Sequence, residues 1–317
     1  YLIFRQLGMV FGWEDNMVYG LTAVATIAYG LYCKSFGRPI LIFMCIIMIP
    51  LATTELGTDG AISGLMEEPM KAAGQHPLWV LIYTSAIMMI LRFWFAGPIV
   101  AKLGPLGLLA TSAVLAIAGL YLLSTASGLV MVFACATLYG FGKTFFWPTM
   151  LAVVGDRYPQ TGAVAMSIMG GIGMLSAGLI GGPGLGYCKD RFAGEELNKT
   201  NPALYAEYKA KEPSTFLNLA STQAFGLDGK KLGEANDKLG AIRKKIEAEK
   251  GDLNTALSKL EPNDKAIIEA STHGDRATLK ADAYIPLTMA AIYLILLIYF
   301  QSIGGYKPVS IGADSGK

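Results

Sequence analysis

Hydrophobic residues gather in long runs along this chain, and mostly short polar connections separate the runs. Seven runs have roughly 20 mainly apolar residues, the length that a helix needs to cross a bilayer. Because backbone polar groups in lipid must be satisfied within the segment, we predict that each run is a helix. The runs are Met17–Cys33, Pro39–Thr58, Leu78–Val100, Leu106–Ser124, Gly128–Val154, Gly162–Gly186 and Ala283–Ile303.

A long polar segment, Lys189–Asp282, separates the sixth run from the seventh and holds 32 of the 50 charged residues. Apolar residues in its middle recur at spacings of three and four, which is typical of an amphipathic helix. This pattern predicts helices over Lys230–Lys250 and Asp252–Leu260, with a turn between them. We expect a solvated helical hairpin; a partner-binding module is the alternative. The apolar positions are Leu232, Ala235, Leu239, Ile242 and Ile246, then Leu253, Leu257 and Leu260.

Basic residues in the connections orient the predicted bundle, because cytoplasmic loops carry an excess of lysine and arginine. The side richer in these residues would therefore be cytoplasmic, with Lys189–Asp282 outside and the C-terminus inside. That side holds Lys34, Arg38, Lys102, Arg157, Lys307 and Lys317. The other holds Glu14, Asp15, Asp59, Glu67 and Glu68, with Arg5 and Lys71 as exceptions.

These patterns divide the chain into five parts. Residues 1–38 form a first spanning helix and a short cytoplasmic connection, and 39–188 hold the spanning helices of one bundle. Residues 189–282 form an extracytoplasmic helical insertion, 283–304 the last spanning helix and 305–317 a cytoplasmic tail. The chain begins at Tyr1 rather than methionine, so we expect an N-terminal part of a longer protein to precede it.

Composition agrees with lipid as the solvent of most of the chain. Hydrophobic residues make up 53% and charged residues 16%, whereas soluble domains carry about 25% charged residues. A net charge of +2 gives no sign of nucleic-acid binding. The four cysteines form no CxxC pair, the two histidines lie far apart, and no phosphate-binding glycine loop is present. We therefore expect no metal, no cofactor and no enzymatic activity.

Ionisable residues inside a predicted span point to function, because burying a charge in lipid is costly. The second run carries Glu55 well inside its apolar stretch, and helical spacing places Thr54 and Thr58 on one shared face. A buried carboxylate here could take up a proton and couple transport, or could contact substrate. The structural alternative is that Glu55 pairs with a cation to hold helices together.

Two basic residues also lie in predicted spans. Arg92 lies near one end of the third run and could reach the membrane surface, hold an anion or pair with Glu55. Lys143 lies about 15 residues into the fifth run, so its ammonium is far from both surfaces. We expect Lys143 to point into a central cavity, where it contacts substrate or pairs with Glu55. Tyr139, Phe146 and Trp147 share its predicted helix face and complete the candidate binding wall.

Glycines in the sixth run predict close helix packing. Gly178, Gly182 and Gly186 stand four residues apart, and such small-xxx-small steps let neighbouring helices approach. Flexing of the helix during a transport cycle is the alternative.

Several short motifs resemble the major facilitator superfamily. Gly97, Lys102 and Gly104 match that family's G-x-x-x-D-R-x-G loop, although Ala101 replaces the acidic residue. Asp156 and Arg157 resemble the short turn between its tenth and eleventh helices. The glycine-rich run ending Gly182-Pro183-Gly184 is similar to its eleventh helix. Thr54-Glu55-Leu56-Gly57-Thr58 is similar to a seventh-helix motif of bacterial sugar or metabolite permeases.

This resemblance implies that the seven runs are helices six to twelve of a twelve-helix transporter. The fold class expected is an all-α membrane bundle with an inserted extramembrane helical segment. The function expected is proton-coupled transport of a sugar, sugar acid or similar metabolite across the cell membrane. The expected partners are the solute, the bilayer and the N-terminal half of the same protein. A receptor or assembly protein that acts through the insertion is the main alternative.

Overall fold

The computed structural model describes residues 1–34, 38–216 and 222–309. Part of the connection predicted at Lys34–Arg38, and the end of the predicted tail with Lys317, lie outside these ranges. Within them, helices form the fold, and the only extended pairings are two isolated antiparallel bridges, Lys209 with Leu227 and Ser214 with Ala224. The described chain divides into two compact units, Tyr1–Ile47 and Met48–Lys317.

The first unit contains two helices and most of a third. Helix α1 (Leu2–Phe11) ends at Gly12, whose φ of 68° is the left-handed conformation that glycine adopts without strain. Helix α2 (Asp15–Cys33) follows, and Arg5 of α1 forms an ion pair with Asp15. Helix α3 (Pro39–Ala52) carries the chain into the second unit and contains Pro50.

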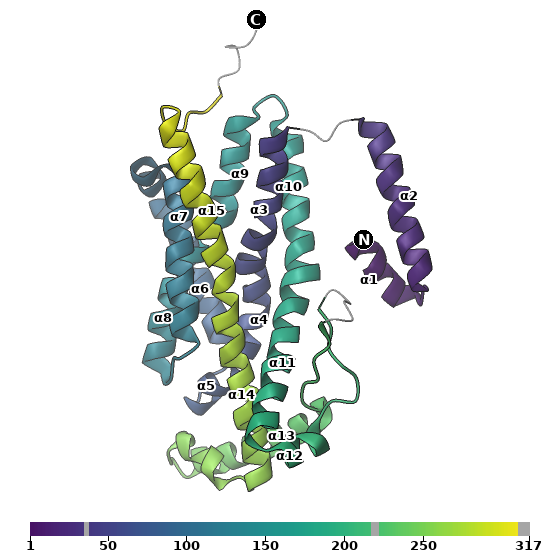
Figure 1. Cartoon of the computed structure of the whole chain (residues 1–317). Coiled ribbons are helices and arrows are strands. Elements are labelled where there is room, and N and C mark those ends of the chain that lie inside the picture. The colour runs from purple at the N-terminus through teal and green to yellow at the C-terminus, as the bar shows by residue number, and fades with distance from the viewer. Residues whose placement is uncertain (35–37, 217–221, 310–317) are drawn as a thin grey trace, which may run out of the picture. The chain divides into compact units, whose positions relative to one another are not determined.

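The second unit is built from long helices, several of which run side by side in Figure 1. Three of them contain a π-helical turn, a wide turn that often marks functional positions in helices. The π turns are η1 (Thr53–Gly57), η2 (Leu91–Phe95) and η3 (Ala177–Gly181). The helices are α4 (Thr58–Leu65), α5 (Glu67–Ala72), α6 (Leu78–Ile90), α7 (Ala96–Leu123), α8 (Leu129–Lys143), α9 (Phe146–Arg157), α10 (Gly162–Ser176), α11 (Gly182–Thr200), α12 (Pro202–Tyr208), α13 (Gly229–Ala248), α14 (Pro262–Asp282) and α15 (Tyr284–Ser302).

Five continuous helical runs among the described residues are long and apolar enough to cross a membrane, so this is a multi-pass membrane protein. The seven predicted spans correspond to these five runs and to α2, which is helical but is not among the five. Two predicted spans fall in one run, Leu78–Leu123. The five are Pro39–Leu65, Leu78–Leu123, Leu129–Arg157, Ala163–Thr200 and Pro262–Ser302.

A sharp break divides the run Leu78–Leu123. Gly104 has φ 66° and ψ 166°, a backbone conformation outside the helix that a side chain would disfavour. Pro105 follows, and its ring restricts the backbone of the residue before it. The break therefore falls in the connection Ala101–Pro105, where the sequence predicts a loop.

The outer part of the second unit comprises α12, α13, α14 and a short 3₁₀ helix, η5 (Leu253–Lys259). The helix predicted over Lys230–Lys250 is confirmed as α13, and the chain turns at Lys250, whose φ is 53°. Asp228 caps α13 by accepting from the Lys230 and Lys231 N–H groups, which lowers the pKa of its carboxyl. The α-helix predicted over Asp252–Leu260 is the shorter 3₁₀ element instead.

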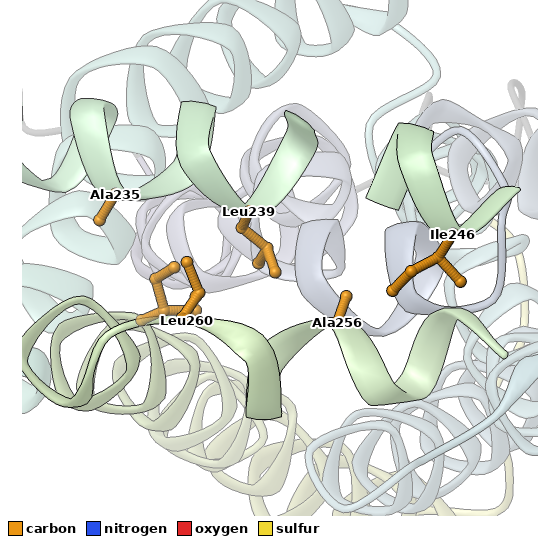
Figure 2. Packing of buried hydrophobic residues seen from close by; sticks show 6 residues of the cluster. Ala235, Leu239, Ile246, Ala256 and Leu260 are labelled. Carbon is orange, nitrogen blue, oxygen red and sulfur yellow. The ribbon is translucent and has the colours of Figure 1, made fainter. Parts of the chain in front are cut away.

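The predicted apolar positions pack α13 against η5, as Figure 2 shows. Leu232 is the exception, because it packs in a neighbouring cluster around Leu197, Leu204 and Ile267. Arg243 of α13 donates to Glu68 of α5 at 2.5 Å, so α13 contacts the short helix between the first two candidate spanning runs. The main cluster is Ala235, Leu239, Ile246, Ala256, Leu260 and Ile268, with Ile242, Leu253 and Leu257 partly buried beside it.

Close packing at the sixth predicted span involves a different glycine from those the sequence indicates. A methyl group placed on Gly181 would lie 3.1 Å from the Cα of Gly57 and 3.2 Å from Thr53 Cγ2. Methyl groups on Gly178 and Gly186 would meet no atom within 4 Å, and one on Gly182 only a carbonyl oxygen at 3.9 Å. The predicted packing face is therefore wrong, because a repeat of four does not reveal which side of a helix meets its neighbour.

Replacing Gly181 by valine is expected to lower the free energy of unfolding by about 1–3 kcal/mol, the usual cost of overpacking. Gly178→Val is the matched control, since it lies on the same helix with open space around it. Thermal and denaturant unfolding of both variants in detergent measures the difference. Equal loss of stability in the two would show that η1 and η3 do not pack against each other through Gly57 and Gly181.

Candidate functional site

Two ion pairs join helices inside the apolar part of the second unit. Arg92 donates from Nη2 to Glu55 Oε1 at 2.7 Å, and Lys143 donates to Asp59 Oδ1. We call these four residues the charge cluster. Both carboxylates lie on the η1–α4 segment. Arg92 lies in η2, and Lys143 is the last residue of α8. Glu55, Arg92 and Lys143, which the sequence singles out, therefore do meet. The pair of Arg92 with Glu55 is one of the alternatives that the sequence leaves open, whereas Lys143 pairs with Asp59 instead of Glu55.

Glu55 is held by donors on both of its oxygen atoms. Its side chain is 3% exposed and lies in the π turn η1. Oε1 accepts from Arg92, and Oε2 accepts from the backbone N–H of Trp147 at 2.9 Å. Trp147 lies in the first turn of α9, where free N–H groups and the helix dipole favour a negative charge. Glu55 therefore binds two structural elements at once.

Arg92 links three elements and borders a cavity. Besides its bond to Glu55, its Nε donates to the carbonyl oxygen of Thr144 at 2.8 Å, just beyond the end of α8. One third of its side chain is exposed. It lines a cavity of about 510 Å³ whose walls also include Pro105, Asp156 and Tyr306. This volume lies within the range of small-molecule sites, roughly 300–1,000 Å³.

Lys143 is fully buried, with 0% of its side chain exposed. Its ammonium donates to Asp59 and to Thr84 Oγ1 at 3.1 Å, and lies 5.3 Å from the centre of the Tyr139 ring. The predicted pairing of Lys143 with Glu55 is therefore wrong. Arg92 occupies Glu55, while Asp59, four residues further along the chain, meets Lys143.

The remaining predicted binding residues surround the cluster. Thr54 points its hydroxyl at the Met289 sulfur, 3.8 Å away, and its carbonyl oxygen accepts from the Tyr139 hydroxyl at 2.8 Å. Phe146 is fully buried and Trp147 is partly buried. Because α8 ends at Lys143 and α9 begins at Phe146, these aromatic residues do not continue the helix face of Tyr139 and Lys143.

Among the residues of the predicted loop motifs, Asp156 lines the cavity that Arg92 borders. Gly97 and Lys102 are exposed, and Gly104 forms the break described above. Asp156 accepts from the Tyr306 hydroxyl at 3.2 Å and, through its carbonyl oxygen, from the Val309 N–H at 2.8 Å. Burial, and then the nearby Asp156 charge, raises the pKa of Tyr306.

Arg157 also contacts the chain after α15, next to the contacts that Asp156 makes. Its guanidinium lies 5.1 Å from the centre of the Phe300 ring and donates to the Lys307 carbonyl at 3.3 Å. Asp156 and Arg157 therefore both bind the segment from Tyr306 to Val309, which follows α15.

Asp282 is a buried residue of this region that sequence reasoning places in the insertion. It is the last residue of α14, and its Oδ2 accepts from the Thr58 hydroxyl at 2.6 Å. Its position next to the apolar run Ala283–Ile303 is the signal that could have identified it. Among the described residues, no group of three or more histidine, cysteine or acidic side chains could hold a metal ion.

Comparison with known proteins found no matching family model, curated protein or solved structure.

Proposed function

We propose that this chain is part of a secondary transporter that moves a small polar organic solute by alternating access. The charge cluster carries the proposal. Four ionisable residues pair between helices inside apolar runs, and such residues mark solute and ion pathways in membrane proteins. A receptor that acts through its outer segment does not need this cluster, which is why we favour the transporter.

The proposed architecture is the C-terminal half of a twelve-helix major facilitator fold with one preceding helix. Leu78–Leu123 has 46 residues and would be about 69 Å long as one straight helix, more than twice the hydrocarbon thickness. The break at Gly104 therefore separates two crossings. With α2 and the other four runs, this gives the seven crossings that the resemblance implies.

The π turns offer the movement that alternating access requires. Glu55 and Arg92 each lie in such a turn, so their ion pair connects η1 with η2. Gly181 in η3 lies against Gly57 in η1. Wide turns hold fewer regular backbone hydrogen bonds than an α-helix and are natural places for a helix to bend. We propose that substrate binding shifts these three turns against one another.

The balance of charge bears on the solute. From the sequence alone, Arg92 and Lys143 outnumber Glu55 in the predicted spans, which favours an anionic group on the solute. Asp59 adds a second carboxylate, so the cluster holds two positive and two negative groups. A neutral sugar, which offers hydroxyl groups to both signs of charge, therefore fits better than a sugar acid.

The cavity beside Arg92 is proposed to be the cytoplasmic half of the solute pathway. Arg157, which follows the lining residue Asp156 in the chain, is among the basic residues that predict the cytoplasmic side. Tyr306 and Pro308 line this cavity, and Val309 donates to the carbonyl oxygen of Asp156. The segment from Tyr306 to Val309 is proposed to be the gate of the pathway. The segment Lys189–Asp282 then lies outside the cell membrane.

Uptake by the full-length gene product in proteoliposomes tests the proposal. We expect labelled neutral hexoses to accumulate under an inward proton gradient, well above protein-free liposomes, and hexuronates to accumulate less. Collapse of the gradient with a protonophore is expected to abolish accumulation. If hexoses, hexuronates and hexitols all fail to enter, while a protein partner binds the segment Lys189–Asp282, the receptor alternative replaces this proposal.

A further inference from the structure

Buried carboxylates are rare in the described part of this chain, and all but one of them have a cation. A nitrogen of a basic side chain lies 2.6–2.8 Å from Glu55, Asp264 and Asp275. Asp282 is equally buried, at 2% exposed, yet no ion pair involves it in the described ranges. The cations of the other three are Arg92, Lys238 and Lys189, respectively.

Asp282 also receives little hydrogen bonding. Thr58 donates to Oδ2 at 2.6 Å, but Oδ1 is buried and has no hydrogen-bond partner among the described residues. An ionised carboxylate has about four lone-pair sites to satisfy. A buried charge with neither a cation nor several donors is strongly disfavoured, and a proton removes most of that cost.

The surroundings of Asp282 also favour the neutral acid, because they are mainly apolar. It borders a cavity of about 260 Å³ that is lined mainly by apolar groups, including Leu185, Phe216 and Ile285. The cavity also contains the buried hydroxyl of Thr53, which has no hydrogen-bond partner in the described ranges. Asp282 and Thr53, each with a buried oxygen that lacks a hydrogen-bond partner among the described residues, thus line one cavity whose apolar walls disfavour a charge.

Among the described residues, the basic groups of the elements packed near Asp282 are paired with other carboxylates or lie elsewhere. Thr58, which donates to Asp282, is followed in the chain by Asp59, so ionising Asp282 would add a negative charge next to the carboxylates of the charge cluster. Lys143, the nearest cation of α8, is engaged by Asp59. On α11, Lys189 pairs with Asp275 and Arg191 pairs with Glu195. Lys280, on the same helix as Asp282, lies over the Tyr121 ring. Tyr187 and Cys188 line the cavity, and Tyr293 of α15 is buried.

We propose that Asp282 is a proton-binding site, protonated in the described conformation and able to release its proton into the adjoining cavity. Thr58 connects the site to the cluster, because Asp59 is its neighbour in the chain and Glu55 lies one turn earlier. Ionisation of Asp282 would place a negative charge on the partner of Thr58, one residue from Asp59. Its role as the coupling site rests on the proposed transport function; the proton site itself does not.

Infrared difference spectra between acidic and alkaline pH test the site without any transport assay. The full-length protein in lipid is expected to show the carbonyl band of a protonated carboxylic acid, which Asp282→Asn removes. Asp264→Asn is the matched control: this buried carboxylate lies on the same helix but has Lys238 at 2.6 Å. The control is expected to keep the band, as is Glu55→Gln. Persistence of the band in Asp282→Asn, or its loss in Glu55→Gln, would overturn the proposal.

Thermal unfolding across pH gives a second, independent readout. A proton held only in the folded state stabilises that state at low pH, and the stabilisation is lost as pH rises and Asp282 ionises. Asp282→Asn should flatten this decline, whereas Asp264→Asn should keep it. If sodium, at constant pH, stabilises wild type and not Asp282→Asn, the site holds a metal cation and the proton proposal fails. Normal spectra with failed uptake would leave the site standing and remove only its coupling role.

Discussion

Lys143→Met is expected to lower the free energy of unfolding by about 3–5 kcal/mol and to abolish uptake. Breaking a buried ion pair by removing one partner leaves the other charge uncompensated, and this is the usual cost. Lys143 is fully buried, and 17% of the Asp59 side chain is exposed. Methionine fills a similar volume, so lost packing contributes little. Denaturant unfolding in detergent and proteoliposome uptake measure the two effects.

Double variants distinguish the pair seen in the structure, Lys143 with Asp59, from the pair predicted from the sequence, Lys143 with Glu55. Asp59→Asn in the Lys143→Met background removes the stranded carboxylate and should recover most of the stability. Glu55→Gln in the same background is the control and should not, because Arg92 and the Trp147 N–H already hold Glu55. Rescue by Glu55→Gln rather than Asp59→Asn would contradict the pairing of Lys143 with Asp59. Restored stability without restored uptake would place Lys143 in solute binding or in the transport cycle.

The sequence predicts three of the four members of this cluster and offers the pair of Arg92 with Glu55 as one alternative, but it pairs Lys143 with the wrong carboxylate. Glu55, Arg92 and Lys143 stand out because an ionisable side chain within an apolar run has a high cost of burial. The choice of partner depends on how helices rotate and approach one another, which a single sequence does not reveal. Glu55 and Arg92 also lie in π turns, which rotate the residues after them relative to a regular helix.

Apolar periodicity predicts well where one face of a helix is buried. Leu239 and Ile246 pack as their spacing predicts, because α13 is amphipathic and its other face is polar. In the spanning helices every face is apolar, so periodicity does not say which side meets protein. This explains why Gly181, rather than Gly178, makes the close contact with Gly57.

The importance of Asp282 is harder to read from the sequence. Asp282 precedes the last apolar run directly, and a reading by polarity assigns it to the insertion. In the structure α14 and α15 are separated only by Ala283, so Asp282 lies at the start of the last spanning segment. A carboxylate at such a boundary can face either solvent or the interior of the helix bundle. The hydrogen bond from Thr58 places Asp282 in the interior.

Arg92→Met is expected to reduce uptake more than tenfold with a smaller loss of stability than Lys143→Met. Its bond to Glu55 is charge-assisted, and such bonds contribute about 1.5–3 kcal/mol. Each 1.4 kcal/mol corresponds to a factor of about ten in an equilibrium constant. The loss of stability is smaller because Glu55 keeps the Trp147 N–H and because one third of Arg92 already reaches solvent.

Arg92→Lys distinguishes charge from geometry at the same position. The guanidinium donates in two directions, from Nη2 to Glu55 and from Nε to the Thr144 carbonyl, and so joins η1 to the end of α8. A lysine supplies one compact charge without that fork. We therefore expect Arg92→Lys to recover stability but to leave uptake well below wild type, because the three elements no longer move together.

Lys71→Met is the control for removing a cation from an ion pair. Lys71 pairs with Glu67 one turn away on α5, with nearly half of each side chain exposed, and such pairs contribute little. Its uptake and stability should match wild type. Full uptake in Arg92→Lys would mean that charge alone suffices at this position. Full uptake in Arg92→Met would remove the Glu55–Arg92 pair from the transport mechanism and, with it, the proposed shift of the π turns against one another.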